Sequence, residues 1–429
     1  MKVSDFYGSA LGLCAAAILA GCGSQPPIGM PGAMPKASAL SARTNSTHFK
    51  VLYSFGNLPD GSYPTAGLID VGGTLYGTTA GGGSNSCTYN PSSFYNGCGT
   101  VFSITTGGEE KVLYKFGPAP DGSVPRAGLV NDGGTLYGTT AYGGTYTCGY
   151  PSQPFSCGTV FSITPDGTEK VLHSFGKGFD GQYPVAGLIK KKGSFYGTTS
   201  GGGSGYCGHS SYSIRCGTVF SITPGGTENV LYSFIPGHHA NTPLGGLIAV
   251  GGTLYGTTSR GGARGYGTVF SMGLGGGMKV LHSFNVTDGR TPFAGLIEVK
   301  GTFYGTTAYG GKDGCGSSSA CDGTVFSITP AGTEKVLHSF GSGADGRAPF
   351  AGLIEANGTF YGTTSGGGAY NQGTVFSITA SGKEQVLHSF AGTDGREPWG
   401  GLIDESGTLY GTTTHGGAYN NGTVFALTP

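Results

Sequence analysis

The sequence predicts an all-β fold, a seven-bladed β-propeller of four-stranded antiparallel blades whose last blade is closed by the N-terminal strand. Three observations predict this fold. One four-strand repeat recurs seven times, its copies are 50–61 residues apart, and the repeat region starts and ends with incomplete copies that complete each other. A repeat of this length with several strands is typical of propellers, whereas solenoids have one short coil per repeat.

The composition fits short strands joined by tight turns. Of 429 residues, 88 are glycine, and 11% of the chain is charged. Helices do not give this composition, because glycine costs about 1 kcal/mol relative to alanine inside a helix. Lysine plus arginine and aspartate plus glutamate are equal at 23 each, so no net charge attracts nucleic acid.

Each copy of the repeat is marked by the segment Val-Leu-x-x-Phe. Its leucine stands at Leu52, Leu113, Leu172, Leu231, Leu281, Leu337 and Leu387. The second copy shows the four strand-like runs clearly, over Ala127–Val130, Thr135–Thr140, Gly158–Thr164 and Glu169–Phe175. All four runs are short and rich in β-branched or aromatic residues, and turn residues separate them.

The two ends of the repeat region predict how the ring closes. The region starts with a lone fourth strand over His48–Phe55 and ends with a lone first-to-third set, at Gly401–Asp404, Thr408–Thr413 and Gly422–Thr428. Seven copies therefore form seven blades over residues 48–429, and the join hides two sheet edges that would otherwise template aggregation. We also expect the small Ala-Gly or Gly-Gly pair of each first strand to lie at the crowded axis.

The repeated motifs also indicate a family. AGLI, LYGTT, GTVFSIT and VLxSF resemble the GloVer tandem repeat of bacterial "choice-of-anchor" proteins. The resemblance covers about residues 49–429 and extends over several motifs in each copy. It implies a surface-anchored repeat protein and assigns no site residues.

The N-terminal residues indicate export and lipidation. An apolar run from Ala10 to Ala20 is too short to span a bilayer. It leads to Leu-Ala-Gly-Cys22, which resembles the lipobox of bacterial lipoproteins. By this resemblance residues 1–21 are a signal peptide, Cys22 carries the lipid, and residues 22–47 form a flexible tether. We expect outer-membrane sorting and membrane contact through the lipid alone; the alternative is an ordinary signal peptide that contains a cysteine.

Eight cysteines form four local pairs, each in the loop between the second and third strands of a copy. The pairs are Cys87/Cys98, Cys148/Cys157, Cys207/Cys216 and Cys315/Cys321. Loops with a pair have 15–19 residues between the GTT threonine and the GTV glycine, and the three loops without one have 8. This correlation favours four local disulfides, which an oxidising compartment permits. A metal site is the weaker alternative because no pair has CxxC spacing.

Candidate binding residues lie in the long loops, which we expect on one face together with the blade-to-blade turns. These loops are rich in Tyr, Asn, Ser and Gly, a composition known from binding loops, and Tyr95, Tyr146 and Tyr212 are the candidates. The alternative is that these tyrosines pack the loops onto the blades. Two breaks in the repeat add candidates: His239 replaces an aspartate, and Trp399, the only tryptophan, replaces a phenylalanine.

Two further positions of the repeat carry ionisable side chains. Asp-Gly turns recur at Asp60, Asp121, Asp180, Asp288, Asp345 and Asp394. A ring of carboxylates would suit calcium, but an aspartate before glycine more often binds its own turn backbone. Histidine replaces the tyrosine of VLxSF at His173, His282, His338 and His388. We expect these histidines to be structural.

Recognised catalytic motifs are absent from the sequence. It lacks HExxH, GxSxG, Walker A and EF-hand patterns, and a GxGxxG match at Gly203–Gly208 has no helix after it. We therefore predict a non-catalytic binding module for a surface glycan or protein, without cofactor or metal. The alternatives are a structural envelope scaffold and a polysaccharide-active enzyme with its chemistry near His239 and Asp313.

Overall fold

The computed structural model describes residues 47–83, 87, 96–150, 153–205, 207, 216–235, 240–312, 322–341 and 344–429. Within these ranges every regular element is a β-strand, as the sequence predicts. None of the described residues forms an apolar helix of the length that crosses a bilayer. The expected signal peptide, Cys22 and the tether up to residue 46 lie outside the described ranges.

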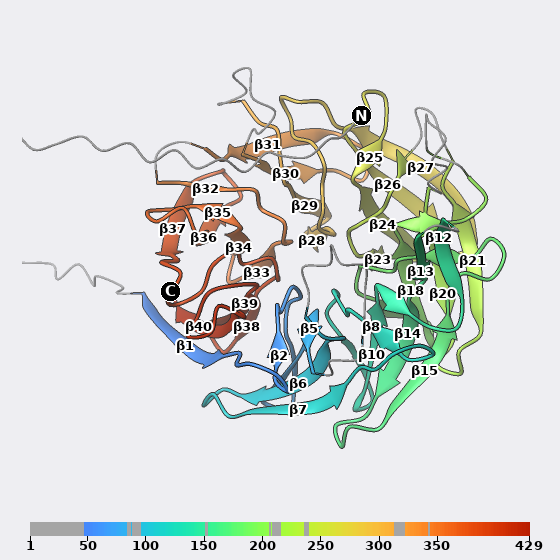
Figure 1. Cartoon of the computed structure of the whole chain (residues 1–429). Coiled ribbons are helices and arrows are strands. Elements are labelled where there is room, and N and C mark those ends of the chain that lie inside the picture. The colour runs from blue at the N-terminus through green and yellow to red at the C-terminus, as the bar shows by residue number, and fades with distance from the viewer. Residues whose placement is uncertain are drawn as a thin grey trace, which may run out of the picture. The chain divides into compact units, whose positions relative to one another are not determined.

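Seven four-stranded antiparallel sheets form the blades of the propeller (Figure 1). Blade 1 contains β3 (Ile69–Val71), β4 (Thr74–Thr79), β6 (Thr100–Thr105) and β7 (Glu110–Lys115). Blade 2 contains β9 (Val130–Asp132), β10 (Thr135–Thr140), β14 (Thr159–Ile163) and β15 (Glu169–Ser174). Blade 3 contains β17 (Ile189–Lys191), β18 (Ser194–Thr199), β20 (Thr218–Ile222) and β21 (Glu228–Ser233).

The remaining blades repeat this order. Blade 4 contains β23 (Ile248–Val250), β24 (Thr253–Thr258), β26 (Thr268–Gly273) and β27 (Gly276–Ser283). Blade 5 contains β28 (Ile297–Val299), β29 (Thr302–Thr307), β30 (Thr324–Ile328) and β31 (Glu334–Ser339). Blade 6 contains β33 (Ile354–Ala356), β34 (Thr359–Thr364), β36 (Thr374–Thr379) and β37 (Glu384–Ser389). Blade 7 contains β38 (Ile403–Glu405), β39 (Thr408–Thr413), β40 (Thr423–Thr428) and β1 (His48–Ser54).

The first strand of the folded region completes blade 7. In Figure 1, β1 (blue) lies beside β40 (dark red), the last strand of the chain. The two strands pair antiparallel, from His48 opposite Thr428 to Ser54 opposite Thr423. The predicted closure is therefore confirmed, and both strands gain a partner along an edge that would otherwise be open.

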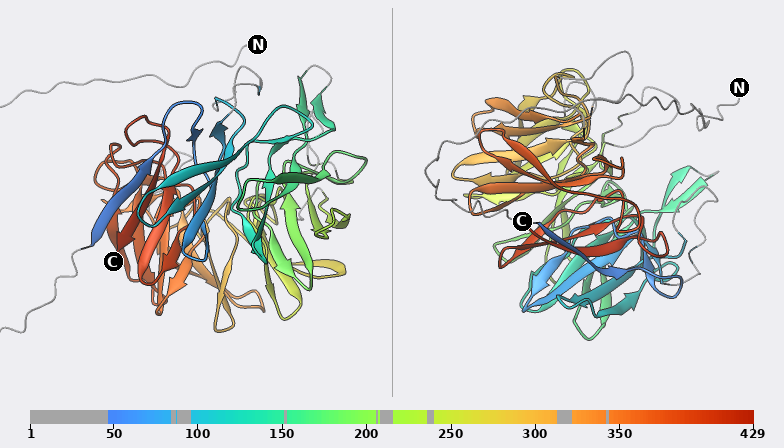
Figure 2. Two further views of the ribbon diagram at one scale, coloured as in Figure 1. Left: turned by 90° about the horizontal axis from the view of Figure 1, so that it is seen from below. Right: turned by 90° about the vertical axis from the view of Figure 1, so that its left-hand side faces the viewer.

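Five blades carry a short two-stranded ribbon next to the end of their second strand. The ribbons lie on the side where the loop between the second and third strands begins. They pair β2 (Gly61–Ser62) with β5 (Gly81–Gly82), β8 (Gly122–Ser123) with β11 (Tyr142–Gly143), β16 (Gly181–Gln182) with β19 (Gly201–Gly202), β22 (Ala240–Asn241) with β25 (Arg260–Gly261), and β32 (Gly346–Arg347) with β35 (Gly366–Gly367). The loop of blade 2 adds the hairpin β12 (Thr147–Tyr150) and β13 (Gln153–Ser156). We name this side the loop face; Figure 2 shows the blades from two other directions.

The innermost strand is shorter than the sequence predicts. In blade 2 the strand starts at Val130, whereas we expected it from Ala127. The Ala127 carbonyl is bonded to Thr78 Oγ1 of blade 1 at 3.0 Å, so it does not depend on a strand ladder. The expected crowding at the axis is present: a Cβ added to Gly67 would lie 2.9 Å from the carbonyl oxygen of Gly401.

The hydrophobic core lies between neighbouring blades and explains two motifs. Phe55, the end of VLxSF, packs edge to face on Phe102 of blade 1, with 5.1 Å between ring centroids, and both are fully buried. Gly77 of LYGTT lies against the same ring, where an added Cβ would be 2.5 Å from Phe102 Cζ. The glycine of LYGTT therefore makes room for the aromatic core.

The first threonine of each GTT joins its blade to the next one. Its hydroxyl bonds to a backbone carbonyl of the next inner segment, in the pairs Thr78–Ala127, Thr139–Ala186, Thr198–Gly245, Thr257–Ala294, Thr306–Ala351, Thr363–Gly400 and Thr412–Ala66. The last pair, at 2.9 Å, closes the ring between blades 7 and 1. These seven residues are named the threonine ring. All are buried, so each bond satisfies a hydroxyl that water does not reach.

Candidate functional site

A pocket lies at the loop-face end of the propeller axis. One residue from every blade lines it, always the residue after the proline in Pro-x-(Ala/Gly)-Gly-Leu: Thr65, Arg126, Val185, Leu244, Phe293, Phe350 and Trp399. Tyr309 of the loop after β29 completes the wall, and the cavity volume is about 350 Å³. This axial pocket is the candidate site, since its size falls within the range of small-molecule sites.

A sevenfold backbone kink positions the pocket residues. The residue before each proline has a positive φ, at Tyr63, Val124, Tyr183, Thr242, Thr291, Ala348 and Glu397. This conformation is unfavourable for residues with a side chain and persists only where surrounding contacts hold it. In blade 2 the Val124 N–H donates to the Cys98 carbonyl at 2.8 Å, and the Val124 carbonyl accepts from Ala141 N–H at 3.1 Å. The next two residues, Pro125 and Arg126, are thereby aimed at the axis.

The pocket wall is asymmetric although the scaffold is repetitive. Blades 5–7 supply an aromatic arc, in which Phe350 lies 4.8 Å from Phe293 and 5.3 Å from Trp399, ring centre to ring centre. Val185 and Leu244 from blades 3 and 4 add an aliphatic sector. The pocket wall therefore has an aromatic side and an aliphatic side.

The remaining sector of the pocket is polar. Blades 1 and 2 supply Thr65 and Arg126, and Arg126 is the charged side chain among the residues that line the cavity. The Thr65 hydroxyl oxygen is buried and has no hydrogen-bond partner among the described residues. This sector can therefore offer a cation and a hydroxyl to a polar or anionic group of a ligand.

The structure separates the predicted binding residues. Trp399 lies in the axial pocket and is 37% exposed. Tyr146 is equally exposed but belongs to the loop of blade 2, outside the pocket wall. Tyr95, Tyr212 and His239 lie outside the described residues. Sequence reasoning missed the other six wall positions. The signal in the sequence was the variable residue directly after the invariant proline of Pro-x-(Ala/Gly)-Gly-Leu in all seven copies.

Three of the four predicted disulfides are confirmed. Cys87–Cys98, Cys148–Cys157 and Cys207–Cys216 are bonded, with Cα atoms 5.2, 5.3 and 5.2 Å apart. Cys315 and Cys321 lie outside the described residues. The carbonyls of Cys98, Cys157 and Cys216 accept from the kink residues of blades 2, 3 and 4, so these bridges support the polar and aliphatic walls of the pocket.

The Asp-Gly turns bond to their own backbone. Asp60 accepts at Oδ1 from Gly61 N–H and at Oδ2 from Gly56 N–H, both at 2.6 Å. Its Oδ2 also accepts from the Tyr53 hydroxyl at 2.8 Å. Where histidine replaces this tyrosine, the imidazole takes the same place, for example with 3.2 Å between His173 Nε2 and Asp180 Oδ2. The position therefore links the last strand of one blade to the turn that follows it.

A glutamate from the next blade joins each of five such pairs. It stands at Glu110, Glu169, Glu228, Glu334 and Glu384, the first residue of the fourth strand. The structure brings Glu110 of blade 1 close to Asp60, which follows the last strand of blade 7. Burial, and then the nearby Asp60 carboxylate, raise the pKa of Glu110 to about 7. The repetition of this glutamate in five copies was the sequence signal for a shared position at the blade interface.

The blades, their N-terminal closure and the axial pocket define a closed tandem-repeat β-propeller. The chain belongs to the Gloeobacter/Verrucomicrobia repeat family, whose model matches residues 38–211 and 209–425. The resemblance to the GloVer repeat is thereby confirmed. No curated protein matches the sequence.

Several solved structures are similar to the chain at low identity. A gluconolactonase from Xanthomonas campestris has 12% identity and a TM-score of 0.44, over 92% of this chain and 93% of that one. A putative 6-phosphogluconolactonase from Bacteroides uniformis has 13% identity and a TM-score of 0.47, over 80% and 88%. A puromycin hydrolase has 11% identity and a TM-score of 0.49, over 81% of this chain and 50% of that one. Likeness at this level assigns no function.

Proposed function

We propose that the protein is a non-catalytic glycan-binding module of the cell envelope and that the axial pocket receives the glycan. The observation that carries this proposal is the ring of seven wall residues, which differ from blade to blade at one fixed position of the repeat. The aromatic arc of Phe293, Phe350 and Trp399 offers flat apolar surfaces of the kind on which the C–H faces of a sugar ring pack. Arg126, in the polar sector, favours a sugar that carries a carboxylate.

Export and a lipid anchor fit this role. The three disulfides indicate an oxidising environment, such as the periplasm or the cell exterior. We propose that Cys22 carries the lipid in the outer membrane and that the following residues tether the propeller to it. A protein partner in place of the glycan, or a purely structural envelope role, is the alternative if no glycan binds.

The binding experiment uses the purified chain with its disulfides formed and a panel of neutral and uronic-acid polysaccharides. We expect saturable binding of an acidic glycan, and we expect Trp399→Ala to weaken the affinity at least tenfold without lowering the melting temperature by more than a few degrees. Tyr370→Ala is the matched control, because Tyr370 is 62% exposed and lies outside the pocket wall. A blank panel, or equal affinity for wild type and Trp399→Ala, would reject the axial pocket as a glycan site.

One observation favours polysaccharide cleavage as a second candidate. A groove of about 510 Å³ between blades 1 and 2 exposes Tyr114, Asp121 and Glu169. Burial, and then Asp121, raise the pKa of Glu169 to about 7, so this carboxyl holds a proton near neutral pH as a general acid requires. The same aspartate–glutamate pair recurs between blades 7 and 1 as Asp60 and Glu110, and this repetition favours a structural role. New reducing ends in the same glycan panel would identify cleavage.

A further inference from the structure

The interface between blades 5 and 6 brings together three side chains that are ligands of transition metals. His338 lies on β31 of blade 5, Asp345 lies in the turn that follows it, and Glu384 begins β37 of blade 6. One ligand atom from each lies within 4.8 Å of the other two. Nothing in the proposed glycan site uses these residues, since they lie between the blades and do not line the axial pocket.

The two carboxylates of this trio differ in how they are hydrogen-bonded. Asp345 is 7% exposed at its side chain, and its Oδ1 accepts from Gly346 N–H at 2.7 Å. Its Oδ2 faces His338 Nε2 at 3.0 Å. Glu384 Oε1 is buried and has no hydrogen-bond partner among the described residues. A bound metal ion would give this oxygen the partner that it lacks among the described residues.

We propose that His338, Asp345 and Glu384 bind a divalent metal ion of the zinc class. One imidazole nitrogen and two carboxylate oxygens are ligands that zinc accepts, whereas calcium takes oxygen ligands only. Tetrahedral ligands of zinc lie about 3.4 Å apart, given bond lengths of about 2.0–2.2 Å. To reach this spacing, the 3.0 Å contact between His338 and Asp345 would widen slightly and the Glu384 carboxylate would move inward, with water in the fourth position. The ion would join blade 5 to blade 6.

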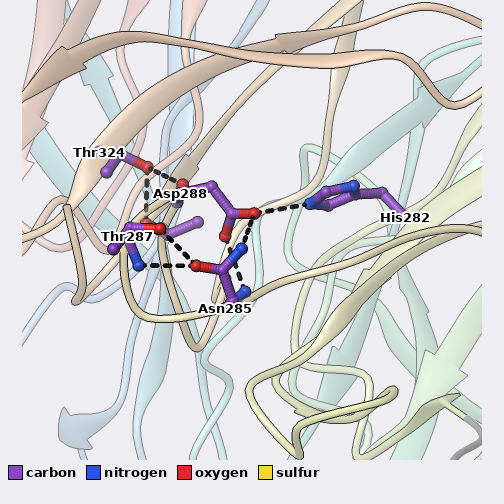
Figure 3. A network of polar contacts seen from close by, with 6 residues as sticks. His282, Asn285, Thr287, Asp288 and Thr324 are labelled. Atoms are coloured by element: carbon purple, nitrogen blue, oxygen red, sulfur yellow. Dashed lines mark hydrogen bonds and ion pairs between the residues drawn. The ribbon is translucent and has the colours of Figure 1, made fainter. Parts of the chain in front are cut away.

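The equivalent site between blades 4 and 5 has the same three residue types, but its aspartate accepts more hydrogen bonds from other protein groups. Figure 3 shows His282 and Asn285 both directed at Asp288. Asp288 Oδ2 accepts from Asn285 Nδ2 at 2.6 Å in addition to facing His282 Nε2 at 3.2 Å, and Oδ1 accepts from Asn285 N–H at 2.7 Å. Because an amide already occupies the oxygen that would bind metal, we expect weaker binding here than at the interface of blades 5 and 6.

Interfaces that lack at least one of the three ligands serve as internal controls. Between blades 6 and 7, Phe49 stands in place of the glutamate and stacks on His388 at 3.7 Å. Between blades 3 and 4, Met278 stands in that place. Between blades 7 and 1, Tyr53 replaces the histidine and donates its hydroxyl to Asp60. Between blades 2 and 3 the three residue types are present as His173, Asp180 and Glu228, but their ligand atoms do not all lie within 4.8 Å of one another in the described structure.

The test is a zinc titration of the full-length, oxidised chain after removal of metal with a chelator. We expect one tight zinc site by calorimetry and a rise in melting temperature, because an ion that binds only the folded state stabilises it. His338→Tyr installs the residue that other copies carry at this position, and Glu384→Gln keeps the side-chain shape. Each should weaken zinc binding at least tenfold, whereas the matched variant His388→Tyr should leave it unchanged.

Three outcomes would overturn the proposal. They are no saturable zinc binding, zinc binding that neither His338→Tyr nor Glu384→Gln weakens, and calcium binding as tight as zinc binding. Circular dichroism of each variant confirms that the β-structure is intact, so that a loss of zinc affinity reports on the ligands and not on unfolding.

Discussion

The threonine ring and the wall of the axial pocket lie close together, and each receives one residue from every blade. The seven positions of the threonine ring hold the same residue, and every hydroxyl is bonded to the next blade. The seven positions of the pocket wall hold six residue types. Each threonine bonds to a carbonyl next to a wall residue, as Thr78 does to Ala127 beside Arg126. The threonine position is nevertheless uniform around the ring, and the wall position varies.

The difference follows from what each side chain contacts. A threonine-ring hydroxyl satisfies a buried carbonyl, so a substitution leaves a polar group without a partner. A pocket-wall side chain points into a cavity, and the kink before its proline is held by hydrogen bonds to its own backbone, as at Val124. The comparison teaches that identity around the ring marks residues that build the propeller, and variation marks residues that are free to suit a ligand.

The largest expected effect contrasts two phenylalanines. Phe161 is fully buried between blades, whereas Phe350 is part of the pocket wall. We expect Phe161→Ala to lower the free energy of unfolding by about 3–5 kcal/mol because it leaves a core cavity. Phe350→Ala should cost less than about 1.5 kcal/mol and weaken glycan binding. Chemical denaturation measures both variants; equal losses of stability would remove the distinction between core and pocket.

A substitution in the threonine ring should have an intermediate effect. Thr412→Val removes the hydroxyl that bonds to the Ala66 carbonyl where the ring closes. We expect a loss of about 1–3 kcal/mol, the cost of a buried polar group without its partner. Thr428→Val, at the exposed end of β40, is the control and should change stability by less than about 0.5 kcal/mol. A neutral Thr412→Val would show that the ring does not hold the blades together.

The smallest expected effect concerns pH. The pKa of Glu110 and of Glu169 is raised from 4.5 to about 7, mainly by burial. A carboxyl whose folded pKa is raised contributes stability that is complete below about 4.5 and is lost as pH rises through 7. The free energy of unfolding should therefore fall between pH 5.5 and 8.5, by about 1 kcal/mol per glutamate, and the melting temperature should fall with it.

Glu110→Gln combined with Glu169→Gln should reduce this pH dependence, since neither amide titrates, and the part that remains comes from Glu228, Glu334 and Glu384, whose pKa is also raised to about 7. Glu355→Gln changes an exposed glutamate and should leave the profile as it is. A wild-type melting temperature that rises from pH 5.5 to 8.5 would contradict the assigned direction.

Features that repeat along the chain could be predicted from the sequence. The blade number, the closure by β1 and the local cysteine pairs all follow from the order and spacing of motifs such as VLxSF. Interfaces between blades could not be predicted in the same way. Glu384 and Asp345 are distant along the repeat, and only the twist and packing of two sheets bring them together. Of the axial pocket, the sequence pointed to Trp399 alone, because a rare residue is easier to notice than a variable position.

The pairing of β1 with β40 also sets an order of folding. His48 lies opposite Thr428, so the final ladder joins nearly the two ends of the described chain. Blades 1–6 can form as their strands become available, while β1 waits for the last three strands. Contacts this distant in sequence slow folding and leave strand edges exposed during that wait. The ring therefore closes last, after the strands of blade 7 near the end of the chain have become available to β1.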